Sequence, residues 1–472
     1  MKPVLIDFLE ETVGKPNVTT QLIDMISYAS DASEFYHRPE AAACPTSTRQ
    51  VAAIMAMAYR EGIPVTPRGA GTSVSGLTVP ARGGIVVDLM RMNKIIKISP
   101  EDRLAVVQPG VVYGDLDRAL RPMGFSFPPE PASGKVSTLG GNVATNAGGV
   151  KGAKYGTTRN YVLALEVVLS DGQILRTGSN TLKCVSGLDL TRLFVGSEGV
   201  LGVITEITLR IDPRPSATST AMSTFESFQD AGRAVAAIMK SGAVPSVLEV
   251  VDRNCIKAIN QNTDMDLPEV EAILLVETDG DTRTETESQM AKITRVFESN
   301  CASAIRMAQT DAEAEALWAA RKSAYPVIAR LNNTVISEDT TVPISRVVDM
   351  LAVIAEIAEK YDITMATVGH VADGNLHPHF TYDSTDPEVS RRVTEARAEL
   401  YRRAIELGGT LTGEHGIGLG KASFMRLEHS EVALGVMRKI KQALDPKNIL
   451  NPGKMDLDVR PDEEERTGIG FP

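Results

Sequence analysis

A glycine-rich segment, residues 131–161, limits the folds that are open to this chain. It contains seven glycines among many small polar residues. Glycine weakens the interior of a helix or a strand, so we expect a loose backbone here rather than a regular element. Compact domains seldom carry a long loop without a use. The segment therefore predicts a backbone that wraps closely around a ligand.

A second glycine-rich segment spans residues 67–76, with the sequence PRGAGTSVSG. Its glycines do not follow G-x-G-x-x-G, and it runs on into a strand instead of opening a helix, so a nicotinamide cofactor is disfavoured. Glycines let successive backbone N–H groups face one anion, and the arginine and hydroxyls of this segment suit a pyrophosphate. Taken alone, the segment is equally typical of a surface turn. A third segment, residues 195–204, leads directly into a strand.

The hydrophobic pattern divides the chain into a strand-rich region and a region in which helices and strands alternate. In the first region we expect a helix that begins after Ser47, a hairpin over 164–177, and strands at 63–66, 84–89, 95–99, 104–108 and 200–211. Residues 212–220 are rich in Pro, Ser and Thr and predict a linker. In the second region we expect strands at 247–252, 272–278 and 363–371 and helices at 226–240, 285–299, 311–328, 346–361 and 430–444. The predicted class is α+β, and 472 residues allow about two or three domains.

The composition excludes several kinds of partner. A net charge of −11 disfavours nucleic acid, because affinity for a phosphate backbone depends on Lys and Arg. We expect no transmembrane segment and no signal peptide, and hence a cytoplasmic protein. The four cysteines, Cys44, Cys184, Cys255 and Cys301, form no C-x-x-C pair, so we expect reduced thiols rather than a metal centre.

Four of the six histidines lie in two short motifs, GHVADGNLHPHF at 369–380 and TGEHGIGLGK at 412–421. In an extended segment His377 and His379 point to the same face, and the turn at 372–375 can bring His370 beside them. Glu414 can complete a set of two histidines and one carboxylate. Such a set suits zinc, manganese, iron or cobalt, although any one of these histidines alone is more typical of a structural role.

The three glycine-rich segments, in this order, resemble the FAD-binding half of the vanillyl-alcohol oxidase or p-cresol methylhydroxylase (PCMH) flavoprotein family, over residues 45–213. The resemblance implies a PCMH-type FAD-binding domain of two subdomains. No His or Cys occurs between Cys44 and Cys184, so we expect non-covalent FAD. The residues that the resemblance places at the cofactor are Arg68, Gly69, Ala70, Gly71, Thr72, Ser73, Gly76, Pro131, Ser133, Gly140, Gly141, Ala144, Gly148, Gly149, Tyr155, Glu198, Gly199, Gly202 and Ile204.

The histidine motifs resemble the FAD-linked oxidase C-terminal domain of D-lactate dehydrogenases, glycolate oxidase flavin subunits and D-2-hydroxyglutarate dehydrogenases. This resemblance implies that His370, His377 and Glu414 bind a divalent transition metal ion, with zinc or manganese expected. It makes His415 the catalytic base and Arg321 a clamp for the substrate carboxylate. It also implies that Asn451 lies at the flavin, and that His379 is either an additional metal ligand or a residue that contacts the ligands. The implied reaction is FAD-dependent oxidation of a D-2-hydroxy acid, such as D-lactate, glycolate or D-2-hydroxyglutarate, to the 2-oxo acid.

The resemblance implies three domains, and two other functions stay open. The domains are an FAD-binding domain at 1–213, an α/β substrate (cap) domain with an antiparallel sheet at 214–424, and a C-terminal helix and tail at 425–472 that pack back on the FAD domain. Where 2-hydroxyglutarate enzymes present a Lys before an Asp, this chain has Ser337-Glu338-Asp339, which favours a monocarboxylate. We expect a homodimer whose electron acceptor is an electron-transfer flavoprotein, a cytochrome or a quinone-linked partner. The alternatives are a non-redox enzyme of the alkylglycerone-phosphate synthase type and a flavin subunit of a multi-chain glycolate oxidase.

Overall fold

The computed structural model describes residues 1–458, and its N-terminal half contains two large sheets and a two-stranded sheet of β7 (Phe125–Ser126) and β11 (Asp212–Pro213). The first is four-stranded, in the order β1 (Val18–Thr19), β2 (Ala41–Ala43), β4 (Ile85–Asp88) and β3 (Val65–Arg68), with β2 and β3 both parallel to β4. Helices α1 (Pro3–Val13) and α3 (Thr48–Glu61) share one apolar core with this sheet. The predicted cap of α3 is confirmed, because the Ser47 side chain accepts a hydrogen bond from the backbone N–H of Gln50.

The second N-terminal sheet is antiparallel and five-stranded. Its order is β5 (Ile95–Ser99), β6 (Leu104–Val107), β10 (Val203–Arg210), β8 (Val162–Val168) and β9 (Ile174–Gly178). Gly172 has a φ of 90° in the β8–β9 hairpin, which confirms the predicted turn. Helices α4 (Tyr113–Leu120), α5 (Leu139–Thr145) and α7 (Leu190–Phe194) pack against this sheet in a second core. These two sheets are the two subdomains that the sequence predicts.

The second half of the chain forms one antiparallel sheet of eight strands. The order is β15 (Ala304–Met307), β12 (Ala217–Phe225), β14 (Ala272–Gly280), β13 (Val247–Asp252), β18 (Thr364–His370), β19 (Asn375–Tyr382) and β16 (Thr334–Ser337), and β17 (Thr340–Thr341) also pairs with β19. Helices α8 (Phe228–Lys240), α10 (Arg283–Ser299), α12 (Val347–Tyr361) and α13 (Pro387–Glu406) contribute to the core on one face. Helices α9 (Arg253–Asn262) and α11 (Asp311–Ile328) contribute to the core on the other.

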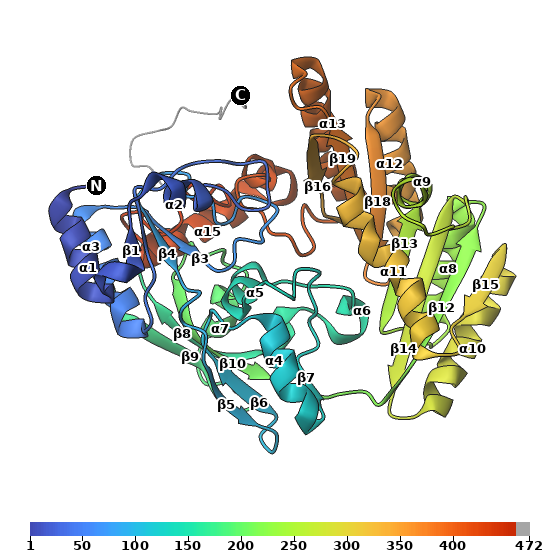
Figure 1. The fold of residues 1–472 in the computed structure, drawn as a ribbon, viewed down its shortest axis with the longest axis horizontal. Helices are drawn as coiled ribbons and strands as arrows, with labels where there is room; N and C mark the ends of the chain where they lie inside the picture. Colours follow the sequence, from blue (N-terminus) through green and yellow to red (C-terminus); the bar gives the residue numbers. More distant parts are fainter. Residues whose placement is uncertain (459–472) are drawn as a thin grey trace.

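The C-terminal helix α15 (Glu431–Leu444) returns to the N-terminal sheets after the short helix α14 (Met425–Glu428). Figure 1 shows the N-terminal sheets on one side of the molecule, the eight-stranded sheet on the other, and α15 lying with the former. The buried ammonium of Lys441 fixes this position by donating to the backbone carbonyls of Val200 and Leu450, at 2.9 and 2.7 Å. The predicted return of the C-terminal segment is therefore confirmed.

Two predictions about secondary structure were wrong in part, and one long helix was not predicted. The predicted linker at 212–220 overlaps β12, because Thr and Ser alternate there on a strand that pairs with β14 and β15. The loose segment at 131–161 contains α5, whose first turn is capped by the Thr138 side chain, and the short helix α6 (Gly152–Tyr155). The sequence prediction omitted α13, whose first turn carries a capping Asp386. Most of the predicted tail, from 459 onward, lies outside the described residues.

Candidate functional site

A deep cavity is lined by residues from all three glycine-rich segments of the N-terminal half. Its volume, including the solvent-open mouth, is about 1290 Å³. The cavity extends along all three segments and continues to Glu414 and His415 of the second histidine motif. The predicted cofactor residues on its wall are Arg68, Gly69, Ala70, Gly71, Thr72, Ser73, Pro131, Ser133, Gly140, Gly141, Ala144, Gly148, Glu198, Gly199, Gly202 and Ile204.

Glycine is required on this wall because neighbouring segments approach the backbone too closely for a side chain. A Cβ atom on Gly69 would lie 2.2 Å from the Thr138 hydroxyl, and one on Gly140 would lie 2.5 Å from the Pro109 ring. A Cβ atom on Gly71 would lie 2.2 Å from the guanidinium of Arg68, which also donates to the carbonyl of Ser30. Glycines at these positions let the backbone pass close to its neighbours, and successive N–H groups in such a loop can face an anion such as a pyrophosphate.

Four predicted cofactor residues lie away from the cavity wall. Tyr155 donates its hydroxyl to Asp279 on β14, at 2.7 Å. Asn451 donates to the backbone carbonyls of Leu77 and Glu198, at 3.0 and 2.7 Å. Gly76 packs closely on Phe35 and Leu419, and Gly149 lies against the backbone of Glu130. These residues support the wall in this structure rather than form it.

Gly149→Ala is expected to destabilise the protein by about 1–3 kcal/mol, as overpacking does. Gly149 has a φ of 134°, and a Cβ atom there would lie 1.9 Å from the carbonyl oxygen of Glu130. Thermal unfolding followed by circular dichroism checks the change. Gly435→Ala in α15 is the control, because nothing lies within 4 Å of its added carbon; there we expect a gain of about 0.4–1 kcal/mol. Equal melting temperatures for the two variants would contradict this account of the wall.

The predicted metal ligands come together at the end of the β18–β19 hairpin. The turn pairs His370 with Asn375 and sets His377 opposite Val368, so both imidazoles lie on one face of the sheet. The Nε2 atoms of His370 and His377 each lie 3.3 Å from the same carboxylate oxygen, Oε1 of Glu414. Two imidazole nitrogens and one carboxylate oxygen thus converge in a buried site, and this donor set fits a divalent transition metal ion.

The charges in this cluster favour a cation between its members. Burial disfavours the charged form of His370, but the carboxylates of Glu249 and Glu414 hold its pKa well above the usual range. Burial likewise disfavours ionised Glu414, but the two histidines hold its pKa well below the usual range. The cluster therefore attracts positive charge, which a metal ion can supply in place of a proton.

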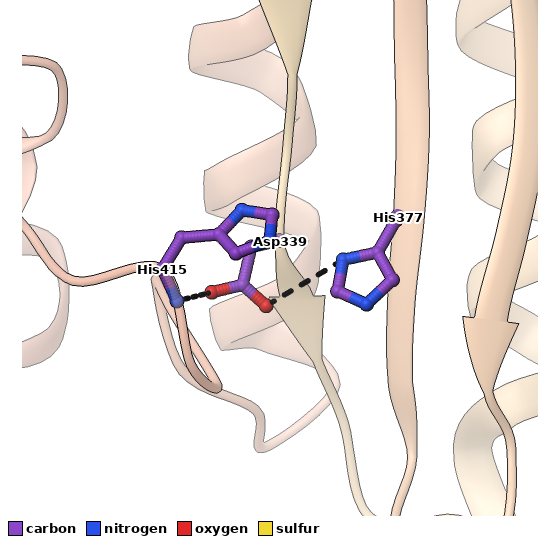
Figure 2. Close-up of side chains that lie close together, drawn as sticks. All are labelled: Asp339, His377 and His415. Carbon is purple, nitrogen blue, oxygen red and sulfur yellow. Dashed lines mark hydrogen bonds and ion pairs between the residues drawn. The ribbon is translucent and has the colours of Figure 1, made fainter. Parts of the chain in front are cut away.

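Asp339 lies at the centre of the site, although the sequence indicated only its neighbourhood as a departure from the 2-hydroxyglutarate enzymes. Its Oδ2 accepts hydrogen bonds from three successive backbone N–H groups, those of Gly413, Glu414 and His415, at 2.9, 2.9 and 2.8 Å. Its Oδ1 lies 4.0 Å from Nδ1 of His377 (Figure 2). One buried carboxylate thus fixes the backbone that carries Glu414 and His415. Burial raises the pKa of Asp339, but His415, Lys421 and His377 outweigh this effect and lower it overall.

His415 lies between the histidine cluster and the cavity. Its ring stacks on that of His377, with centroids 4.9 Å apart and planes 17° apart, and it lines the cavity wall. Burial lowers the pKa of His415 to about 4, against the opposing effect of Asp339. The imidazole is therefore neutral at neutral pH and can accept a proton.

Two other predicted residues lie beside the cluster. Arg321 on α11 donates its Nε–H to Oε2 of Glu249, at 2.7 Å, and the other oxygen of Glu249 contacts Nδ1 of His370. His379 lies outside the groups that could hold a metal ion, with hydrogen-bond contacts to Ser337 Oγ at 3.3 Å and the Ala366 carbonyl at 3.2 Å. Burial lowers the pKa of His379 to about 3. The sequence prediction did not include Glu249, although a charged residue within the apolar strand β13 could have indicated a buried functional carboxylate.

The cavity and the cluster adjoin through contacts between distant parts of the chain. Glu198 in the third glycine-rich segment accepts hydrogen bonds from the backbone N–H groups of Ile417 and Gly418, at 2.6 and 2.8 Å. A Cβ atom on Gly148 would lie 2.7 Å from Oε2 of Glu414. Glu414 and His415 themselves line the cavity. The cavity therefore extends to Glu414, the carboxylate that both metal-candidate histidines approach.

Two family models match the chain on either side of this junction. The FAD binding domain model matches residues 39–178, and the model of the C-terminal domain of FAD linked oxidases matches residues 214–455. The chain belongs to the FAD-linked oxidase family. The resemblance found in the sequence is confirmed, and this FAD-linked oxidase is an FAD-dependent oxidoreductase.

Relatives of this FAD-linked oxidase match along nearly the whole chain. It is 42% identical over 449 residues to glycolate oxidase subunit GlcD of Bacillus subtilis (strain 168), covering 95% of each protein. It is 34% identical over 427 residues to D-lactate dehydrogenase of Anaerostipes hadrus, covering 89% of this chain and 90% of that protein. The structure of p-cresol methylhydroxylase with substrate bound matches with a TM-score of 0.78 at 19% identity, over 96% of each chain, which confirms the PCMH-type fold. Within residues 1–458, no helix has the length and apolar character needed to cross a bilayer.

Proposed function

We propose that this FAD-linked oxidase converts a D-2-hydroxy acid to the 2-oxo acid. The observation that carries the proposal is that Glu414 and His415 line the FAD cavity, while Oε1 of Glu414 lies 3.3 Å from Nε2 of both His370 and His377. Relatives named as a glycolate oxidase subunit and a D-lactate dehydrogenase support the same class of substrate. Oxidation of a 2-hydroxy acid requires loss of a proton from oxygen and of a hydride from C2. We assign the proton to His415 and the hydride to bound FAD.

His415 is the proposed base for the hydroxyl proton. It lines the cavity and stacks on His377, so its ring lies between the proposed metal ligands and the space for a substrate. Arg321 is the proposed clamp for the substrate carboxylate, and a charge-assisted hydrogen bond of this kind contributes about 1.5–3 kcal/mol. His370, His377 and Glu414 would hold a zinc or manganese ion, which when bound lowers the pKa of a coordinated hydroxyl. Non-covalent FAD, when bound in the cavity, serves as the hydride acceptor.

The substrate that we propose is a monocarboxylate such as D-lactate or glycolate. Ser337 precedes Glu338 and Asp339 where the 2-hydroxyglutarate enzymes present a Lys, and its hydroxyl contacts His379 at 3.3 Å. Glu338 is turned away from the cluster and is paired with Arg397 and Tyr401. The two cations beside this segment, Arg397 and Lys421, already pair with Glu338, at 2.6 and 3.6 Å, which favours a substrate with one carboxylate.

Anaerobic mixing with a panel of D- and L-2-hydroxy acids tests the proposed function, with flavin absorbance as the signal. We expect D-lactate or glycolate to bleach the flavin and their 2-oxo acid product to accumulate, with D-2-hydroxyglutarate much less effective. Failure of every acid to bleach the flavin would contradict the proposal and would favour a reaction without net redox turnover, as in alkylglycerone-phosphate synthases.

A flavin subunit of a larger assembly is a second candidate, because the first relative is named as a subunit of glycolate oxidase. An assay of the isolated chain with an artificial dye acceptor separates the two cases. Steady turnover by the isolated chain supports an enzyme that works alone. Flavin bleaching without dye reduction, restored by added partner chains, supports the subunit.

A further inference from the structure

Glu249 is a buried carboxylate that contacts two residues of the proposed site at once. It lies on β13, which pairs with β18 so that Glu249 is directly opposite His370. Its side chain is fully buried, with an exposed fraction of 0%. One oxygen contacts Nδ1 of His370 and the other accepts from Nε of Arg321 at 2.7 Å. A carboxylate at this depth is stable only because both partners compensate its charge.

This contact determines which nitrogen of His370 is free. An ionised carboxylate can only accept hydrogen bonds, so Nδ1 of His370 carries a hydrogen and donates it in the hydrogen bond to Glu249. The lone pair is then on Nε2, the atom that lies 3.3 Å from Glu414 and faces the remaining ligands. Such outer carboxylates fix the ring orientation and raise the basicity of a histidine ligand.

The same carboxylate also fixes the guanidinium of Arg321. Only Nε of Arg321 is used in the bond to Glu249, so the two terminal nitrogens remain available for a second carboxylate. Arg321 comes from α11 and His370 from β18, and the side chain of Glu249 is the direct link between them.

We propose that Glu249 is a positioning residue that orients His370 for metal binding and holds Arg321 beside the substrate. This inference rests on the proposed metal-assisted function and extends it to a residue that contacts neither metal nor substrate. It predicts an effect on metal affinity itself, which can be measured without any turnover.

The test is Glu249→Gln in the full-length, FAD-loaded protein, titrated with Zn²⁺ and with Mn²⁺ against a chromophoric chelator. We expect metal affinity to weaken by about 10–100-fold, as is usual when an outer partner of a metal ligand is lost. Asp252→Asn is the matched control, because Asp252 is also a buried carboxylate on β13 but accepts hydrogen bonds from Cys255 and Thr367. It should retain the affinity of the wild type.

The outcomes separate this inference from the proposed function. If the wild type binds metal and His377→Ala abolishes binding, but Glu249→Gln binds as tightly as the wild type, the positioning role is wrong and the metal site stands. If Glu249→Gln and Asp252→Asn weaken metal affinity equally, the positioning role is also wrong, because the effect would then not depend on contact with His370 and Arg321. If the wild type binds neither ion, the metal site itself is wrong. If Glu249→Gln fails to fold, Glu249→Asp takes its place, because it retains the charge but is too short to reach both partners. Its affinities for Zn²⁺ and Mn²⁺ are compared with those of the wild type in the same way.

Discussion

His415→Ala is expected to abolish reduction of the flavin by substrate while the protein still binds FAD. His415 contacts the cluster and the cavity but lies outside the glycine-rich segments that form most of the cavity wall. A positioned general base contributes about 10²–10⁴-fold to rate, so the rate of anaerobic flavin bleaching should fall by that factor. Stopped-flow absorbance measures the rate, and the visible spectrum of the purified variant reports its FAD content.

The control for this variant is His37→Ala, because His37 is exposed and lies in the N-terminal half, away from the cavity lining. It should bleach at the wild-type rate. Added imidazole is expected to restore part of the activity of His415→Ala, because the missing ring leaves space on the cavity wall. A His415→Ala protein that holds FAD and bleaches at full rate would rule out His415 as the base.

Removal of divalent metal ions is expected to lower kcat/KM by about 10²–10⁴-fold, since a bound cation contributes several kcal/mol to catalysis. Dialysis against a chelator, followed by assay before and after addition of Zn²⁺ or Mn²⁺, measures the loss and the recovery. FAD content should change little, because the glycine-rich segments form most of the cavity wall and Glu414 is the one proposed ligand that lines it.

Glu414→Gln is expected to weaken metal binding by substitution, as a chelator does by removing the ion. Glu414 Oε1 is the atom that both Nε2 nitrogens approach, at 3.3 Å, and a neutral amide oxygen is a weaker ligand for a transition metal than a carboxylate. We expect this variant to need much more added metal for activity than the wild type. Full activity of the chelated wild-type protein, with metal content verified as negligible, would exclude the metal-assisted reaction.

The proposed ligands could be predicted because a local feature brings most of them together. The motif at 369–380 contains its own turn, so the spacing of His370 and His377 along two strands already sets them on one face of the sheet. Glu249 and Asp339 could not be assigned in this way. Each is brought to the histidines by pairing or loop contacts between distant segments, and a sequence alone does not give strand order.

The fold shows the same division between local and long-range information. The cap at Ser47 and the turn at Gly172 are short-range signals, and both predictions are confirmed. The strand β12 was read as a linker because its Ser and Thr residues resemble loop composition, yet pairing on both edges with β14 and β15 makes it a central strand. The segment forms a strand because of its pairing with distant strands, and composition gives no information about such pairing.

A zinc-edge anomalous difference map from crystals of the FAD-loaded, zinc-loaded protein tests whether the metal site and the flavin share one cavity. We expect one peak about 2.0–2.2 Å from Nε2 of His370, Nε2 of His377 and a carboxylate oxygen of Glu414, facing the flavin ring across a space for one small acid. A map with no peak among these three residues, or with the flavin ring on the far side of the cavity from His415, would contradict it.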